Sequence, residues 1–130
     1  LWENIALGNP AIRMESVTDF AARTGLNDFI NTLKNGYDTI LDPTGKRLPR
    51  SVIHKILLIR ALVGKPGLLL LEEPWLNSEN EHRSQIIQLL TEIKNTTMVV
   101  VTNDEEFANL CDTIITLEEG TARITYTKIK

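Results

Sequence analysis

Two consecutive carboxylates, Glu72 and Glu73, follow a run of four leucines and precede Pro74. A short apolar run between Gly67 and two acids favours a buried parallel strand over a helix. Ligands bind at the carboxyl ends of such strands in open α/β sheets. There the first acid could help to hold Mg²⁺ through water, and the second could orient or deprotonate an attacking water molecule. The other interpretation is a solvated turn after a core strand, and this motif alone leaves both open.

The elements that would position these acids alternate between helix and strand. Apolar residues recur at helical spacing in residues 14–23 and again in residues 26–33. Residues 50–63 are apolar on nearly all sides, which predicts a largely buried helix. Residues 68–71 are the strand before the two acids, and residues 98–101, Met-Val-Val-Val, predict a second buried strand.

Several residues mark where the helices should begin and end. Gly25 is a plausible helix stop, and Pro49 suits the first turn of the helix that follows it. Ser78, with Glu81 three residues later, forms a capping box that would open a helix. Asn103, also followed three residues later by an acid, could cap another helix.

A hairpin is expected at the C-terminal end of the chain. The tripeptide Glu118-Glu119-Gly120 separates residues 113–117 from residues 122–127, and both flanking segments have strand character. The order is a helical first half, then strand, helix, strand, helix and hairpin. Such an order predicts an α/β fold in which parallel strands with helices are followed by a C-terminal β-hairpin.

The composition of the 130 residues is that of one ordinary globular domain, with 42% hydrophobic and 24% charged residues. A net charge of −3 argues against nucleic acid as a partner, because no basic excess is present to neutralise phosphates. No apolar run approaches the ~20 residues that span a membrane, so the chain itself is expected to be soluble. Its first residues contain no signal peptide and no initiator Met, which suggests a piece of a longer protein.

Segments along nearly the whole chain resemble the nucleotide-binding domain of exporter-type ATP-binding cassette (ABC) ATPases. The spacing from Tyr37 to Glu79 agrees with that family without insertion or deletion. The matching segments are Asn4-Ile5-Ala6-Leu7-Gly8 (family pattern ENIxLG), Asp28-Phe29-Ile30 with Asn35-Gly36-Tyr37-Asp38-Thr39 (DFI and GYDT), Arg60-Ala61-Leu62 (RAL), residues 68–73 (LLLDE, the Walker B strand), residues 96–102 (the strand before the switch histidine) and residues 112–120 (DxIxxLExG).

This resemblance implies a partial P-loop NTPase (ABC ATPase-like) fold, with a helical subdomain over residues 1–63 and a Walker B and switch-strand part over residues 64–130. It implies a parent protein at the cytoplasmic face of the cell membrane that hydrolyses ATP, with Mg²⁺, to drive transport. Glu73 stands at the position of the family's catalytic glutamate, and Glu72 at that of its Mg²⁺-binding aspartate. The implied partners are a second nucleotide-binding domain, identical or different, and the transmembrane domains of the transporter.

The chain departs from this family at the residues that would contact the nucleotide. Pro49, Arg50 and Ser51 stand within the signature LSGGQ, which in the family closes over ATP held by the opposite subunit. Pro49 removes a hydroxyl and an N–H there, and Arg50 adds bulk where glycine allows close approach. The charge of Arg50 could meet a phosphate, or Arg50 could be a plain surface residue. Asn103 stands at the position of the family's switch histidine. Its amide can form hydrogen bonds but cannot titrate as an imidazole does. The other interpretation of Asn103 is a helix cap.

The remaining reactive side chains predict no site of their own. His54 falls where the family has a glutamine after its signature and is interpreted as structural. His82 is expected on the exposed side of its helix, in contact only with solvent. Cys111 is expected to be a buried, unreactive thiol.

No GxxxxGK[ST] phosphate-binding loop occurs in the 130 residues. The isolated chain is therefore expected to bind neither ATP nor Mg²⁺ and to be inactive. The resemblance also implies that a sheet strand is missing, so the isolated chain is expected to self-associate through unpaired strands. The degenerate motifs suggest a weakened or non-hydrolysing site in a paired transporter. The alternative function is a pseudo-ATPase interaction module that keeps the ABC fold without nucleotide chemistry.

Overall fold

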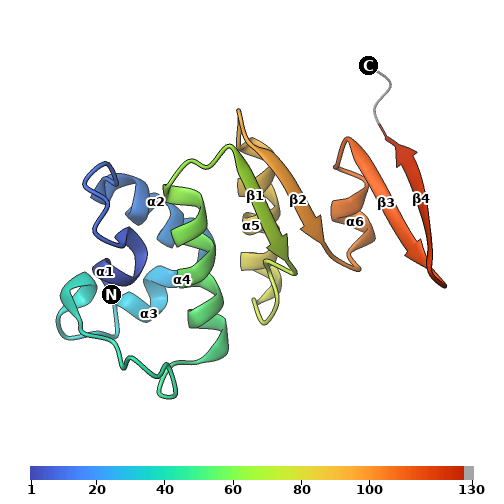
Figure 1. The fold of residues 1–130 in the computed structure, drawn as a ribbon. Coiled ribbons are helices and arrows are strands. Elements are labelled where there is room, and N and C mark those ends of the chain that lie inside the picture. The colour runs from blue at the N-terminus through green and yellow to red at the C-terminus, as the bar shows by residue number, and fades with distance from the viewer. Residues whose placement is uncertain (128–130) are drawn as a thin grey trace. The chain divides into compact units, whose positions relative to one another are not determined.

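The computed structural model describes Leu1–Thr127, and Lys128–Lys130 lie outside that description. The chain divides into two compact units, Leu1–Val100 and a second that begins at Val101. Figure 1 shows a mixed α/β fold in which helices come first, strands that alternate with helices follow, and two consecutive strands come last. The division expected at Val63, between a helical and a Walker B part, stays a prediction.

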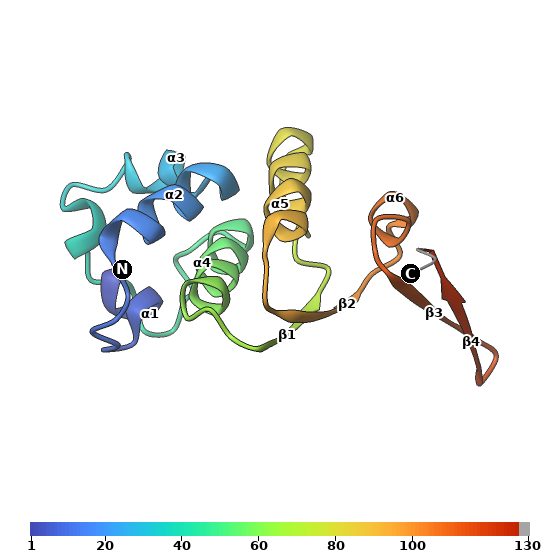
Figure 2. The same cartoon turned by 90° about the horizontal axis from the view of Figure 1, so that it is seen from above.

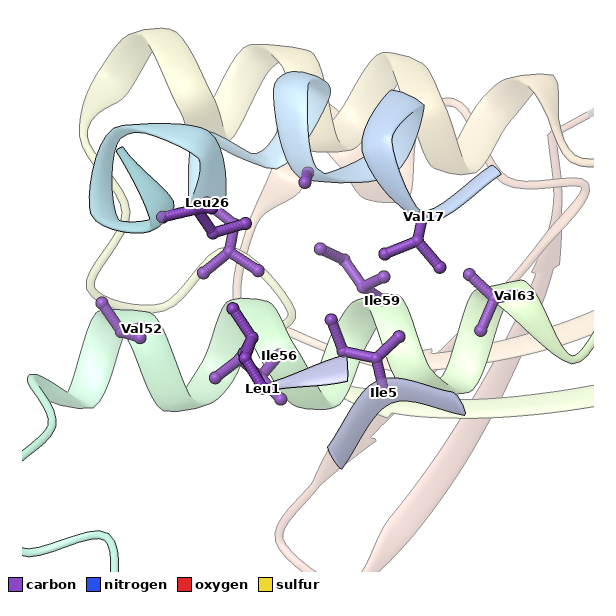
Figure 3. Close-up of a cluster of buried hydrophobic side chains, with 10 residues drawn as sticks. Leu1, Ile5, Val17, Leu26, Val52, Ile56, Ile59 and Val63 are labelled. Carbon is purple, nitrogen blue, oxygen red and sulfur yellow. The ribbon is translucent and has the colours of Figure 1, made fainter. Parts of the chain in front are cut away.

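Four α-helices and one 3-10 helix form the first part of the first unit. They are α1 (Trp2–Ala6), α2 (Met14–Thr24), α3 (Leu26–Ile30), the 3-10 helix η1 (Gly36–Asp38) and α4 (Arg50–Val63). The apolar residues of α4 recur at intervals of three and four, so Val52, Ile56, Ile59 and Val63 share one face. Figure 3 shows this face meeting Val17 of α2 across the core. The prediction of a largely buried helix over residues 50–63 is confirmed.

The two-stranded sheet of the first unit is a β–α–β arrangement. Strand β1 (Leu68–Glu72) and strand β2 (Thr97–Val101) are neighbours, and α5 (Asn80–Glu92) lies between them in the sequence. The arrows of β1 and β2 point the same way in Figure 1, as expected for parallel strands, and α5 lies to one side of them in Figure 2. The N–H of Thr97 donates to the carbonyl of Gly67 at 2.9 Å, which joins the starts of the two strands.

The prediction that both strands are buried is wrong. Side chains of a strand alternate between two faces, and only one face of β1 is covered by described residues. Leu69 is buried, whereas its neighbours Leu68 and Leu70 are 56% and 68% exposed. On β2, Val99 and Val101 are 50% and 63% exposed. The apolar run therefore identified the strands correctly, but it could not show that one face would be open.

The second unit is a short helix followed by an antiparallel hairpin. Helix α6 (Glu105–Ala108) precedes β3 (Thr113–Glu118) and β4 (Thr121–Tyr126), with Ile115 opposite Ile124. The two loop residues, Glu119 and Gly120, both have positive φ, 44° and 79°. Two consecutive positive φ angles are the geometry of the tightest hairpin turns, in which a second-position glycine is preferred. The predicted hairpin is confirmed.

Gly25 ends α2 with φ 73°, as its sequence position predicts, but two other predicted helix ends are wrong. The residue before α5 is Glu79 rather than Ser78, and no side chain caps this helix end. The residue before α6 is Asp104 rather than Asn103, and its Oδ1 accepts from the N–H of Phe107 at 3.0 Å. A carboxylate is a stronger acceptor than an amide at a helix start, which explains why Asp104 takes this place.

Asp104→Ala is expected to lower the free energy of unfolding of the second unit by about 1 kcal/mol, the usual contribution of a helix cap. Asn103→Ala, one residue earlier, is the matched control and should cost less, because Asn103 lies outside the cap. Amide hydrogen exchange over residues 105–110 measures both. Equal protection loss in the two variants would mean that Asp104 is not the cap.

Candidate functional site

The two acids predicted as a site lie side by side at the end of β1. Glu72 is the last residue of the strand and is exposed, and Glu73 begins the next turn and is half-buried. The backbone of Glu73 has φ 40°, in the left-handed region that residues with a Cβ rarely adopt. Strained backbone of this kind costs about 1–3 kcal/mol and is frequent at functional sites. The strain marks Glu73 as a residue whose orientation the fold holds in place.

The turn that carries Glu73 is anchored on both sides. The N–H of Leu76 donates to the carbonyl of Glu73 at 2.8 Å, and the N–H of Ser78 donates to the carbonyl of Trp75 at 3.0 Å. Trp75 is 6% exposed, so the turn is held by a large buried ring. The burial of Trp75 was not predicted from the sequence.

The three signature-position residues lie together at the start of α4. Pro49 is the residue before the helix, and its carbonyl accepts from the N–H groups of Val52 and Ile53 at 3.0 and 3.1 Å. Arg50 is exposed and Ser51 is half-buried in the first turn. The first N–H groups of a helix lack intrahelical partners and carry partial positive charge, so this end of a 14-residue helix favours anions.

The start of α4 and the end of β1 lie at the same end of the first unit. Helix α4 runs up and β1 runs down in Figure 1, and only residues 64–67 connect them. This arrangement places Pro49, Arg50 and Ser51 toward the end at which Glu72 and Glu73 lie. Asn103 belongs to the second unit, where it is an exposed residue between β2 and α6.

The prediction that His82 only contacts solvent is wrong. Its side chain is 15% exposed, and Nε2 lies 3.8 Å from Oδ2 of Asp28. The ring covers Gly25, where an added Cβ would overlap it. Nothing in the local sequence signalled this contact, because Gly25 and His82 lie far apart in the chain.

The burial of two other reactive residues, Cys111 and His54, is intermediate. Cys111 is a free thiol that is half-buried rather than fully buried, and its Sγ donates to the carbonyl of Phe107 at 3.6 Å. His54 is half-buried on α4.

Within residues 1–127, neither the hollow described next nor any cluster of metal-ligating side chains provides a second site for the predicted chemistry. A hollow of about 610 Å³ lies beside α3 and the loop before α4, and no predicted site residue lines it. Within residues 1–127, no cluster of three or more His, Cys, Asp and Glu side chains has a metal-binding arrangement. No helix in that same range has the length and apolar character needed to cross a membrane.

No protein-family model matches the chain, but curated proteins do. It is 31% identical over 119 residues to the alpha-hemolysin translocation ATP-binding protein HlyB of Escherichia coli O157:H7. It is 32% identical to the leukotoxin export ATP-binding protein LtxB of Aggregatibacter actinomycetemcomitans, and 33% to the leukotoxin translocation ATP-binding protein LktB of Mannheimia haemolytica. Each match covers 91% of this chain and 17% of the relative, so the chain spans about a sixth of these proteins.

A solved ABC exporter has a fold similar to that of this chain. A bacterial Atm1-family ABC exporter, solved with ATP bound, matches 97% of this chain and 22% of its own with a TM-score of 0.80 and 23% identity. The chain is homologous to part of the ATP-binding proteins of ABC exporters. The resemblance expected from its ordered motifs is confirmed.

Proposed function

We propose that this chain is part of the ATP-binding domain of an ABC exporter that hydrolyses ATP to drive transport. The observation that carries the proposal is the position of Glu73 at the end of β1, in a strained and anchored turn. A partial P-loop NTPase fold is part of the same proposal, and the phosphate-binding loop would come from other sequence of the parent protein.

In this proposal the six site residues would act on water, Mg²⁺ and nucleotide. Glu73 would orient the attacking water and accept its proton, and Glu72 would hold Mg²⁺ through water from its exposed place at the strand end. The donor set fits Mg²⁺ bound through one carboxylate and several waters. ATP with Mg²⁺ would supply the phosphoryl group. Arg50 and Ser51, after Pro49, would face ATP bound to a second ATP-binding domain, and Asn103 would stand at the switch position.

The proposed partners are a second ATP-binding domain and the transmembrane domains of the parent, at the cytoplasmic face of the membrane. The exposed leucines and valines of β1 and β2 support a need for additional polypeptide. Sheets of two strands are marginal alone, and open strand edges invite pairing with other chains. We therefore expect the isolated chain to self-associate.

The second candidate is a pseudo-ATPase module that keeps the fold without hydrolysis. Pro49 favours it, because a prolyl residue has neither the hydroxyl nor the N–H that the family's signature serine offers at the start of α4. Asn103 favours it too, because an amide cannot accept a proton as a histidine can.

Hydrolysis of MgATP by the purified parent protein in lipid decides between the two candidates. The proposed function expects phosphate release that requires Mg²⁺, together with ATP-dependent uptake into inside-out vesicles. Binding of ATP without phosphate release above the background of protein-free vesicles would favour the pseudo-ATPase.

A further inference from the structure

His82 and Gly25 join α5 to the turn between α2 and α3. A methyl group added at Gly25 would overlap the imidazole ring of His82, so the ring lies directly on the glycine backbone. Gly25 also has φ 73° where it ends α2, a conformation that glycine adopts without steric cost. Two separate features therefore favour glycine at position 25: its positive φ and the lack of space for a side chain beneath the His82 ring.

Other contacts hold the same elements together. Nζ of Lys55 on α4 donates to the carbonyl of Gly25 at 3.3 Å, and burial lowers the pKa of this ammonium. At the far end of α5, Nη2 of Arg23 lies 2.6 Å from Oε2 of Glu92, and Nε2 of Gln88 donates to Oε1 of Glu92 at 3.0 Å. The hydrogen bond from Arg23 lowers the pKa of Glu92. Helix α5 therefore contacts α2 at two places: His82 in its first turn lies on Gly25, and Glu92 at its last turn pairs with Arg23.

The first turn of α5 is connected directly to the carboxylate turn. Helix α5 starts at Asn80, and only residues 74–79 separate it from Glu73. Trp75, buried within this segment, limits how far the turn can move independently of its surroundings. Residues 74–79 therefore form a short link between the Glu73 turn and the end of α5 that carries His82.

We propose that the contact between His82 and Gly25 is a latch that holds the Glu73 turn against the helical part of the first unit. Opening the latch frees the first turn of α5 and, with it, residues 73–79. The latch goes beyond the proposed ATPase function, because it needs neither nucleotide nor hydrolysis and acts in the chain alone.

The latch depends on the shape of the ring rather than on charge. The ion pair to Asp28 is long, at 3.8 Å, and the Asp28 side chain is 79% exposed, so solvent screens it. Nδ1 of His82 is buried and has no hydrogen-bond partner among the residues that the structure describes. A flat ring without nitrogens should therefore fill the same place.

Amide hydrogen exchange of the 130-residue chain tests the latch. In His82→Ala, exchange over residues 74–82 should become about tenfold faster, while exchange in the β3–β4 hairpin stays unchanged. His82→Phe, which keeps a ring over Gly25, and Asp28→Asn, which removes only the charge, should both leave residues 74–82 protected. Unchanged exchange in His82→Ala, or equal loss in His82→Phe, would overturn the latch.

The double variant keeps the test decisive if one substitution perturbs folding. Gly25→Ala alone should speed exchange of residues 74–82, because the new methyl group displaces the ring. Combined with His82→Ala, it should add nothing over these residues, because the ring is already gone. Additive effects of the two substitutions would show that Gly25 and His82 act separately, and the latch would be wrong.

Discussion

Glu73→Gln in the parent protein should lower steady-state ATP hydrolysis by about 10²–10⁴-fold, the usual contribution of a general base. The amide has nearly the same shape as the carboxylate but cannot accept a proton, so folding and nucleotide binding should persist. The turn is held by backbone hydrogen bonds and by Trp75, neither of which needs the carboxylate. Phosphate release at saturating MgATP is the measurement.

Two control variants show whether the effect belongs to Glu73. Glu81→Gln makes the same change at an exposed position on α5 and should leave turnover within about twofold of the unmodified protein, as expected for surface substitutions. Asn103→Ala should have a smaller effect than Glu73→Gln, because the imidazole of the switch position is already missing. If Asn103→Ala lowered turnover as much as Glu73→Gln, the role assigned to Glu73 would be wrong.

Ile59→Ala should lower the free energy of unfolding of the chain by about 2–5 kcal/mol, the range for removing a large aliphatic side chain from a packed core. Ile59 is 0% exposed and lies near the centre of the cluster between α2 and α4 (Figure 3). A small domain has only ~5–15 kcal/mol of net stability, so this single change would remove a large share of it. Urea unfolding followed by circular dichroism measures the difference.

Leu57→Ala is the matched control on the same helix. Leu57 is 48% exposed, two residues before Ile59, and its removal should cost about 1 kcal/mol or less. Equal losses from the two substitutions would mean that α4 is not packed through the face that carries Ile59.

Long periodic patterns and turn chemistry predicted most of the elements. Residues 50–63 were expected to be a buried helix and form α4 with the same bounds, because their apolar repeat is long and Pro49 marks its start. The hairpin followed from Glu119 and Gly120, since few sequences suit two consecutive positive φ angles. Patterns of this kind are local, and local rules decide where helices and turns form.

Burial and distant contacts could not be predicted in the same way. The apolar runs of β1 and β2 indicated strands, but whether a face is covered depends on other parts of the structure, and Leu70 and Val101 are largely exposed. His82 was expected to contact only solvent because it falls on the exposed side of its helix, and its contact with Gly25, at another helix end, left no local signal. The residues before α5 and α6, Glu79 and Asp104, each lie one residue after those predicted, which is the usual precision with which a sequence locates a helix end.

The candidate site was predicted through the family resemblance rather than through local chemistry. Glu72 and Glu73 alone favoured a solvated turn over a site, and the ordered motifs on either side gave them a role. The left-handed backbone of Glu73 had no sequence signal, because glutamate rarely adopts it. The roles assigned to Pro49, Arg50, Ser51 and Asn103 stay predictions.

The central claim is that this chain carries the carboxylates of an ATP site but not the loop that holds the phosphates. Isothermal titration of the 130-residue chain with MgATP tests it most directly. Phosphate affinity in P-loop proteins comes from backbone N–H groups and a lysine, and two carboxylates without them repel the nucleotide. We expect no saturable heat up to about 1 mM MgATP, so any binding would be weaker than about −4 kcal/mol. Saturable binding at micromolar concentration would contradict the claim, because the chain would then hold a complete phosphate site.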